Sequence, residues 1–130
     1  MFYLYNPNPA QSGAGDCAVR ALAKALDTSW EDAYIKLAVN GFLAGDMPNS
    51  DAVINTVLRE NGFERRAVPN TCPDCYTIAD FAADHPIGTF VVKSDNHVTA
   101  VINGSIFDAW DSSRKVPMYF WEKQTTDKED

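Results

Sequence analysis

The chain has 130 residues, which is enough for one domain and too few for an enzyme with a cleft between two domains. Its hydrophobic fraction of 45% supports one real core and excludes disorder throughout. Asp and Glu number 18 against 11 Lys and Arg, which gives a net charge of -7. Such a surface repels a phosphate backbone and no segregated basic patch is visible, so we expect no nucleic-acid partner.

The sequence carries no signal for a membrane or for secretion. No stretch approaches the roughly 18 to 20 uncharged apolar residues of a membrane span. Residues 1–7 lack the basic and apolar segments of a secretory signal. We therefore expect a cytoplasmic protein with no membrane partner. The three cysteines form an odd set in a domain large enough to fold without disulfides, so free thiols are expected.

Four helices are predicted in the first two thirds of the chain. Apolar residues recur there at helical spacing, behind Asp, Ser or Thr residues of the kind that cap helix starts. Asn-Gly pairs end the second and third helices, and a proline stops the fourth. The predicted ranges are 16–26, 29–41, 50–62 and 77–85.

The pattern then changes to short β-rich runs. The strongest lie at 89–93, 97–102 and 105–110, and 63–68 and 117–121 are plausible further strands. Helices followed by an antiparallel sheet predict an α+β fold. We expect a single domain over residues 1–122, followed by a polar, disordered tail over residues 123–130.

Cys17 is the first candidate for chemistry, because it lies in the first turn of the first predicted helix. A helix start carries a partial positive charge and free N–H groups, and both favour a thiolate. Gly13 and Gly15 would let the backbone approach a substrate closely, or bend sharply before the helix. The alternative is that Cys17 is a small buried apolar residue in an alanine-rich helix.

A predicted hairpin supplies a histidine and an acid. Asn103-Gly104 is a strong signal for a two-residue turn, which would pair Ile102 with Ser105. His97 would then face Trp110, and Asp108 would lie diagonal to His97 on the same face of the sheet. A three-residue loop would instead place Asp111 on that face. Asp108 is the predicted partner of His97.

Cys72 and Cys75 form a Cys-x-x-Cys motif in a predicted loop. A structural zinc usually needs four ligands, and His85 could add only a third. A thioredoxin-like role would need the pair at a helix start in a βαβ unit. We therefore expect neither a metal nor a redox cofactor, and an incidental loop pair that could close a local disulfide if oxidised.

The order of Cys17 at a helix start, His97 on a strand and Asp108 on the next strand resembles the papain-like cysteine peptidase superfamily, in its compact bacterial and phage members. These enzymes commonly carry a glutamine a few residues before the nucleophile, and Gln11 precedes Cys17 by six positions. Ala18 stands where these enzymes usually have an aromatic residue.

The resemblance implies a papain-like fold, with N-terminal helices packed on a C-terminal antiparallel sheet. It implies Cys17 as nucleophile, His97 as base, Asp108 as the orienting acid and Gln11 as oxyanion donor. The expected activity is hydrolysis of a peptide or isopeptide bond in a peptide or protein substrate, without a cofactor. A catalytically silent binding or inhibitor module, and an acyl or amine transferase with the same triad, are the alternatives.

Overall fold

Four helices and a six-stranded mixed sheet make up the computed structural model, which describes residues 1–11, 15–69 and 71–125. The predicted α+β class is confirmed. The sheet order is β1-β5-β4-β3-β6-β2, with β1 parallel to β5 and the other neighbours antiparallel. In chain order the elements are β1 (Phe2–Leu4), α1 (Cys17–Ala25), α2 (Trp30–Ala44), α3 (Asp51–Glu60), β2 (Phe63–Ala67), α4 (Ile78–Asp84), β3 (Thr89–Ser94), β4 (His97–Ile102), β5 (Ser105–Asp108) and β6 (Tyr119–Lys123).

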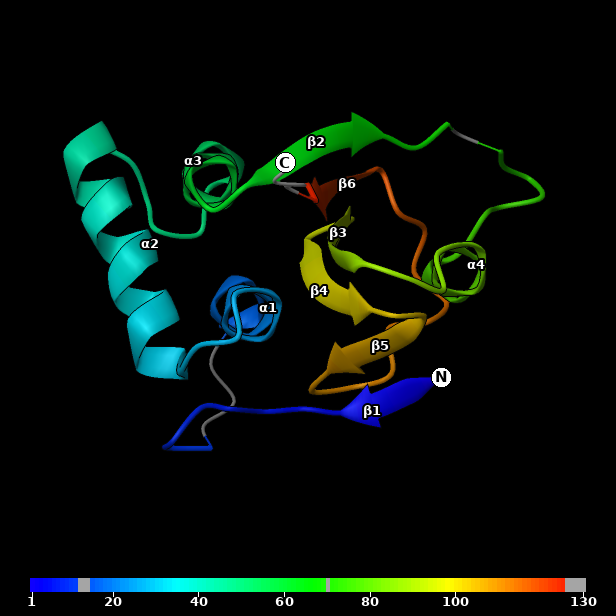
Figure 1. The fold of residues 1–130 in the computed structure, drawn as a ribbon, viewed down its shortest axis with the longest axis horizontal. Coiled ribbons are helices and arrows are strands. Elements are labelled where there is room, and N and C mark those ends of the chain that lie inside the picture. Colours follow the sequence, from blue (N-terminus) through cyan, green and yellow to red (C-terminus); the bar gives the residue numbers. More distant parts are fainter. Residues whose placement is uncertain (12–14, 70, 126–130) are drawn as a thin grey trace.

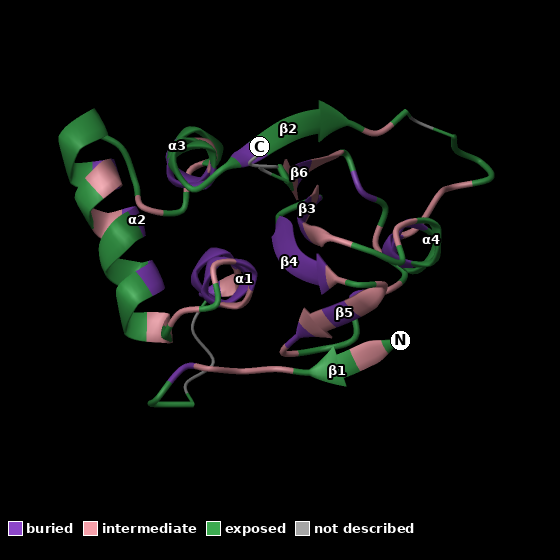
Figure 2. Ribbon diagram, viewed as in Figure 1, coloured by how far each residue is buried: buried purple, intermediate pink, exposed green. Residues whose placement is uncertain are grey.

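Helices cover both faces of the sheet. α1 and α3 lie on one face, with α2 packed on their outer side, and α4 lies on the other face (Figure 1). β4 runs through the middle of the sheet and is buried along most of its length (Figure 2). Among the described residues no helix has the length and apolar character that crossing a membrane requires.

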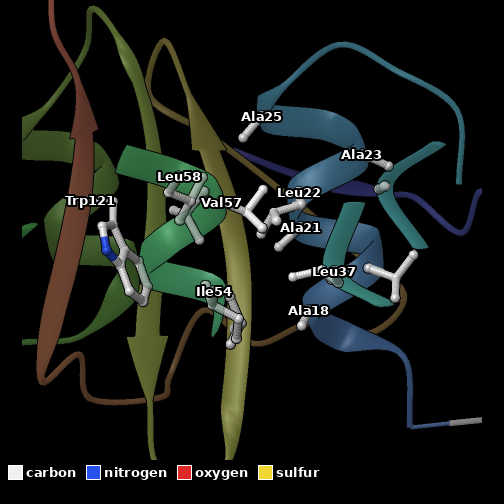
Figure 3. Close-up of a cluster of buried hydrophobic side chains, with 14 of the residues drawn as sticks. Ala18, Ala21, Leu22, Ala23, Ala25, Leu37, Ile54, Val57, Leu58 and Trp121 are labelled. Atoms are coloured by element: carbon white, nitrogen blue, oxygen red, sulfur yellow. The ribbon is translucent and has the colours of Figure 1, made fainter. Parts of the chain in front are cut away.

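The larger core fills the space between α1, α3 and the sheet. Figure 3 shows Leu22 of α1 and Leu58 of α3 directed into it, together with Trp121 of β6. The indole N–H of Trp121 donates to Oδ1 of Asn55 at 2.9 Å, which satisfies the one polar group of this side chain. The buried side chains of α1 include several alanines, and their small size lets the helix pack closely on β4.

The predicted hairpin is present with its predicted register. Asn103 and Gly104 have φ angles of 49° and 78°, as a tight two-residue turn requires. Ile102 pairs with Ser105, and the ladder continues along both strands. The strand after the turn is shorter than expected, because β5 ends at Asp108.

The predicted end of the second helix is wrong. α2 continues through Gly41 to Ala44 and ends at Gly45, which has a φ of 67°. Gly41 has a different role, since a Cβ on it would lie 2.9 Å from the carbonyl oxygen of Asp46. The absence of a side chain at Gly41 allows the loop after α2 to pack against the helix. Gly41 therefore marks a close contact between helix and loop, and not the end of the helix.

The prediction of a purely C-terminal, antiparallel sheet is also wrong. β1 was not predicted, and its three residues pair in parallel with β5, so the sheet is mixed. β2, which confirms the strand predicted over 63–68, precedes α4 in the chain and pairs with β6. A three-residue strand has no periodicity of its own, and it forms here because β5 offers it an edge.

Two further expectations change, one about the cysteines and one about where the domain ends. Cys72 and Cys75 form a disulfide, which corrects the expectation of three free thiols and leaves Cys17 as the free cysteine. β6 extends to Lys123, and the backbone N–H of Gln124 donates to the carbonyl of Gly62 at 2.8 Å. The first residues assigned to the tail therefore belong to the domain, whereas residues 126–130 lie outside the described residues.

Candidate active site

The three predicted catalytic side chains come from the ends of three neighbouring elements. Cys17 is the first residue of α1, His97 the first residue of β4, and Asp108 the last residue of β5. β4 and β5 are the two strands of the hairpin, and α1 packs against β4 (Figure 1). One hairpin register and one helix-to-sheet contact therefore place all three residues together.

His97 lies between the other two residues. Its Nε2 lies 2.6 Å from Oδ2 of Asp108, and its side chain also acts on Cys17, because it is one of the groups that lower the pKa of that thiol. Because Nε2 faces the carboxylate, Nδ1 is the nitrogen left for the sulfur. His97 and Asp108 are only 6% and 2% exposed, whereas Cys17 is half-buried. Cys17 is thus the most exposed of the three residues.

Asp108, and not Asp111, is the acid that contacts His97. Besides His97, the Asp108 carboxylate accepts the hydroxyl of Ser112 at 2.6 Å and the backbone N–H of Ala109 at 2.8 Å. Burial acts to raise the pKa of Asp108, but these hydrogen bonds and the charge of His97 outweigh it and lower the pKa. Asp111 is exposed and accepts a hydrogen bond from its neighbour Ser113.

Trp110 lies over the imidazole, as the hairpin register predicts. The two ring centroids are 4.6 Å apart and the planes are tilted by 43°. Trp110 remains 46% exposed, so its indole forms a partial cover between His97 and solvent. A cover of this kind shields the bond between His97 and Asp108 from competing water.

The environment of Cys17 favours the thiolate. Burial is the largest influence on the pKa of Cys17 and acts to raise it. Hydrogen bonds from the side chain of His97 and the backbone of Val98, together with the positive charges of His97 and Arg20, lower it, and the net shift is downward. A lowered pKa distinguishes a nucleophilic cysteine from a structural one.

His97 shifts in the complementary direction. Burial acts to lower its pKa, but the hydrogen bonds to Asp108 and Cys17 and their negative charges raise it from 6.5 to about 9. The two shifts act in the same sense, since each favours a thiolate beside an imidazolium over a thiol beside a neutral imidazole. This is the protonation state from which a cysteine attacks a carbonyl group.

Gln11 is the predicted site residue for which the described contacts give no support. It is exposed, and its Nε2 donates to the carbonyl oxygens of Asn6 at 3.2 Å and Asn8 at 2.7 Å. Both bonds lie within its own loop. The role of Gln11 as oxyanion donor therefore stays a prediction that these contacts do not support.

The start of α1 supplies other donors for an oxyanion. The first N–H groups of a helix have no partner within the helix, and the side chain of Asp16 does not cap them. The N–H groups of Cys17 and Ala18 belong to this first turn, where the helix dipole favours negative charge. Of the two glycines noted in the sequence, Gly13 lies outside the described residues and Gly15 is exposed.

Two side chains around Asp108 were not predicted. Ser112 is fully buried and donates to the carboxylate, and Arg20 is 8% exposed with its Nη2 3.4 Å from Oδ1 of Asp108. The sequence holds a partial signal for each. Arg20 lies one turn after Cys17 on the same helix, and Ser112 follows Asp108 closely in the chain. Neither spacing is specific enough to identify a partner without the fold.

The residues considered for metal binding are used differently. Cys72 and Cys75 are joined to each other, and Nδ1 of His85 lies 2.7 Å from the carbonyl oxygen of Phe81. Within the described ranges there is no group of three or more His, Cys, Asp or Glu side chains that could hold a metal ion.

Replacing Cys17 with serine is expected to make stability depend on pH above about 6.5, the ordinary pKa of histidine. In the wild-type protein the folded state binds one proton in this window, on His97, and the unfolded state also binds one, on the cysteine. Equal proton numbers give little pH dependence. In Cys17→Ser the folded imidazolium has no such counterpart. Asp108 still acts to raise the pKa of His97 but the contribution of Cys17 is gone, so stability is lost as the pH rises from 6.5 through a folded-state pKa below the wild-type value of about 9.

The loss relative to the wild-type protein is expected to be on the order of 1–2 kcal/mol. Urea unfolding of both proteins at pH 6.5 and pH 9 measures this loss. The change in unfolding free energy of the wild-type protein between the two pH values is subtracted from that of the variant, which removes the effect of all other titrating groups. An equal change in the two proteins would contradict a thiolate–imidazolium pair.

Comparison with protein-family models, with curated proteins and with solved structures found no match for this chain. Any function assigned to it therefore rests on the geometry of its own site.

Proposed function

We propose that this chain is a cysteine hydrolase of the papain-like kind that cleaves a peptide or isopeptide bond. The observation that carries the proposal is the buried pair of His97 and Asp108, 2.6 Å apart, beside a cysteine at a helix start whose thiol pKa His97 acts to lower. A thiol, an imidazole and a carboxylate in this order are the parts of nucleophilic acyl transfer. A merely structural cysteine needs neither the imidazole nor the buried acid.

The first half of the reaction forms an acyl-enzyme. The Cys17 thiolate attacks the carbonyl carbon, a C–S bond forms, and the carbonyl oxygen becomes an oxyanion. The N–H groups at the start of α1 face this charge, and a single such donor contributes about 3 kcal/mol to transition-state stabilisation. His97 then gives its Nδ1 proton to the amine nitrogen, the C–N bond breaks, and the amine leaves.

The second half restores the enzyme. His97, now neutral, takes a proton from a water molecule, whose oxygen attacks the thioester carbon. The C–S bond breaks, the acid product leaves, and the proton on His97 restores the ion pair with Cys17. Throughout both halves Asp108 keeps its charge and holds the proton on Nε2, so that Nδ1 faces the reacting atoms.

Trapping with a library of electrophilic peptides tests the proposal. Cys72 and Cys75 are tied in a disulfide, so an electrophile has one free cysteine to modify. We expect one adduct per chain by intact mass spectrometry, mapped to Cys17, at a rate that depends on the peptide sequence. The variant His97→Ala should lose this reaction and Asp111→Asn should keep it.

The competing functions give different outcomes in the same assay. A silent binding module would show no adduct, or an adduct whose rate ignores both the peptide sequence and His97, and either result would refute the hydrolase. Hydrolysis and transfer share the acyl-enzyme. They are separated by adding an amine to a substrate found in the library and asking whether acid or amide accumulates.

A further inference from the structure

Arg20 is a buried cation held between two carboxylates. It is 8% exposed, and one terminal nitrogen is paired with Oδ1 of Asp16, while the other lies 3.4 Å from Oδ1 of Asp108. Asp16 is the residue immediately before Cys17 at the start of α1, and Asp108 is the partner of His97 in β5. The guanidinium therefore spans the two elements that carry the two ends of the candidate triad.

The Asp16 end of this bridge is itself fixed. Oδ2 of Asp16 accepts the indole N–H of Trp30 at 2.9 Å and the side-chain amide of Asn8 at 3.3 Å. Asp16 is buried and makes no capping bond to α1, although aspartate is a favoured capping residue. Its carboxylate is thus used to hold Arg20 and the loop before the helix, not to cap the helix.

This arrangement is poorly explained by stability alone. The Nε of Arg20 is buried and has no hydrogen-bond partner among the described residues. Unsatisfied buried donors are costly, and well-packed apolar side chains often replace buried ion triads without loss. A planar guanidinium can, however, reach two carboxylates with two separate nitrogens, which an apolar residue cannot do.

We propose that Arg20 is a positioning residue: its guanidinium joins Asp16 to Asp108 and so fixes the helix start bearing Cys17 against the carboxylate that orients His97. This inference rests on the proposed function. It assigns Arg20 a place behind the triad, where it acts through Asp108 and does not touch a substrate.

Electrostatics supports the same assignment. Burial is the largest influence on the pKa of Cys17 and raises it, and the charge of Arg20 is among the influences that lower it. The charged groups that face Arg20 are Asp16 from its own helix and Asp108 from β5, with His97 of β4 bonded to the second. Loss of the cation would leave the buried carboxylates of Asp16 and Asp108 without the counter-charge that lies between them.

The pH profile of Cys17 alkylation by iodoacetamide tests the inference in the full chain. In Arg20→Gln we expect alkylation at pH 6 to slow by about tenfold, because the thiolate fraction falls with the loss of the charge and the bridge. Arg20→Lys keeps the charge without the two-pronged geometry and should recover only part of the rate. Asp16→Asn, which weakens the other end of the bridge, should also slow the reaction.

Arg66→Gln is the matched control. Arg66 also lies 2.9 Å from each of two carboxylates, those of Glu64 and Glu122, but on an exposed part of the sheet. This change should leave the alkylation profile unaltered. Thermal unfolding shows which variants are folded at the assay temperature. If Arg20→Gln is unfolded there, the alkylation rates of Arg20→Lys and Asp16→Asn test the inference.

Two results would overturn the inference. One is an Arg20→Gln protein that unfolds at a lower temperature yet keeps the wild-type alkylation profile, which would make Arg20 structural only. The other is full recovery in Arg20→Lys, which would make charge sufficient without the bridge. A wild-type Cys17 that reacts like an ordinary thiol would instead refute the proposed function, so the two failures are distinguishable.

Discussion

Replacing His97 with alanine is expected to slow alkylation of Cys17 at pH 6 by about 100-fold, because the thiolate then loses its hydrogen-bond donor and its counter-charge. Burial, the largest influence on the pKa of Cys17, would then act against the thiolate with only the Val98 backbone and Arg20 opposing it. The pH profile of iodoacetamide alkylation, followed by mass spectrometry of the Cys17 peptide, measures the change.

His85→Ala is the matched control for this experiment. It removes the other of the two histidines in the chain, whose ring stacks on Phe81 with centroids 3.9 Å apart. His85 follows α4 on the opposite face of the sheet from α1 (Figure 1). We expect the wild-type rate in this variant. Equal rates in wild-type and His97→Ala protein would refute the pairing of Cys17 with His97.

The second large effect is expected at Asp108. In Asp108→Asn the imidazole loses a carboxylate at 2.6 Å and keeps only a neutral amide. The pKa of His97, about 9 in the wild-type protein, should fall by about two units, because both the hydrogen bond and the charge that raise it are removed. NMR titration of the imidazole protons follows this shift directly.

The same substitution should also reduce nucleophile reactivity near neutral pH, since a neutral imidazole is no counter-ion for the thiolate. Asp111→Asn is the paired control, because Asp111 is exposed and contacts Ser113 instead of His97. An unchanged His97 titration in Asp108→Asn, or an equal shift in Asp111→Asn, would show that the acid of the triad is misassigned.

The parts of this site that the sequence could predict are those set by local rules. Asn103-Gly104 fixes a two-residue turn, the turn fixes the register, and the register places Asp108 and Trp110 next to His97. Cys17 was placed at a helix start by an equally local signal, the aspartate before an alanine-rich stretch. The meeting of α1 with β4 was a hypothesis that only the fold could test.

The parts that the sequence could not predict depend on competition between distant groups. Gln11 stands at a plausible spacing before Cys17, but spacing does not show that the carbonyls of Asn6 and Asn8 take its amide. The aspartate at the helix start was expected to cap the helix, and it pairs with Arg20 instead. Both outcomes depend on which hydrogen-bond partners the fold places next to each polar side chain.

β1 and Gly41 illustrate the same limit in the scaffold. Three residues cannot show a strand period, and Phe2–Leu4 is a strand only because β5 lies alongside. The Asn-Gly pair at 40–41 resembles a local signal for a helix end, yet the helix continues, and Gly41 is required there because the carbonyl oxygen of Asp46 approaches it closely. Contacts made across the chain outweighed local propensity in both places.

The pH dependence of Cys17 alkylation in the wild-type protein tests the central claim most directly. Cys17 is the free cysteine, so a single reaction reports a single thiol. We predict a midpoint below the value of about 8.5 for an unperturbed cysteine, and alkylation in mildly acidic buffer faster than that of an unperturbed thiol. A midpoint at or above that of an unperturbed thiol would contradict the thiolate–imidazolium pair, and with it the proposal that this chain is a cysteine hydrolase.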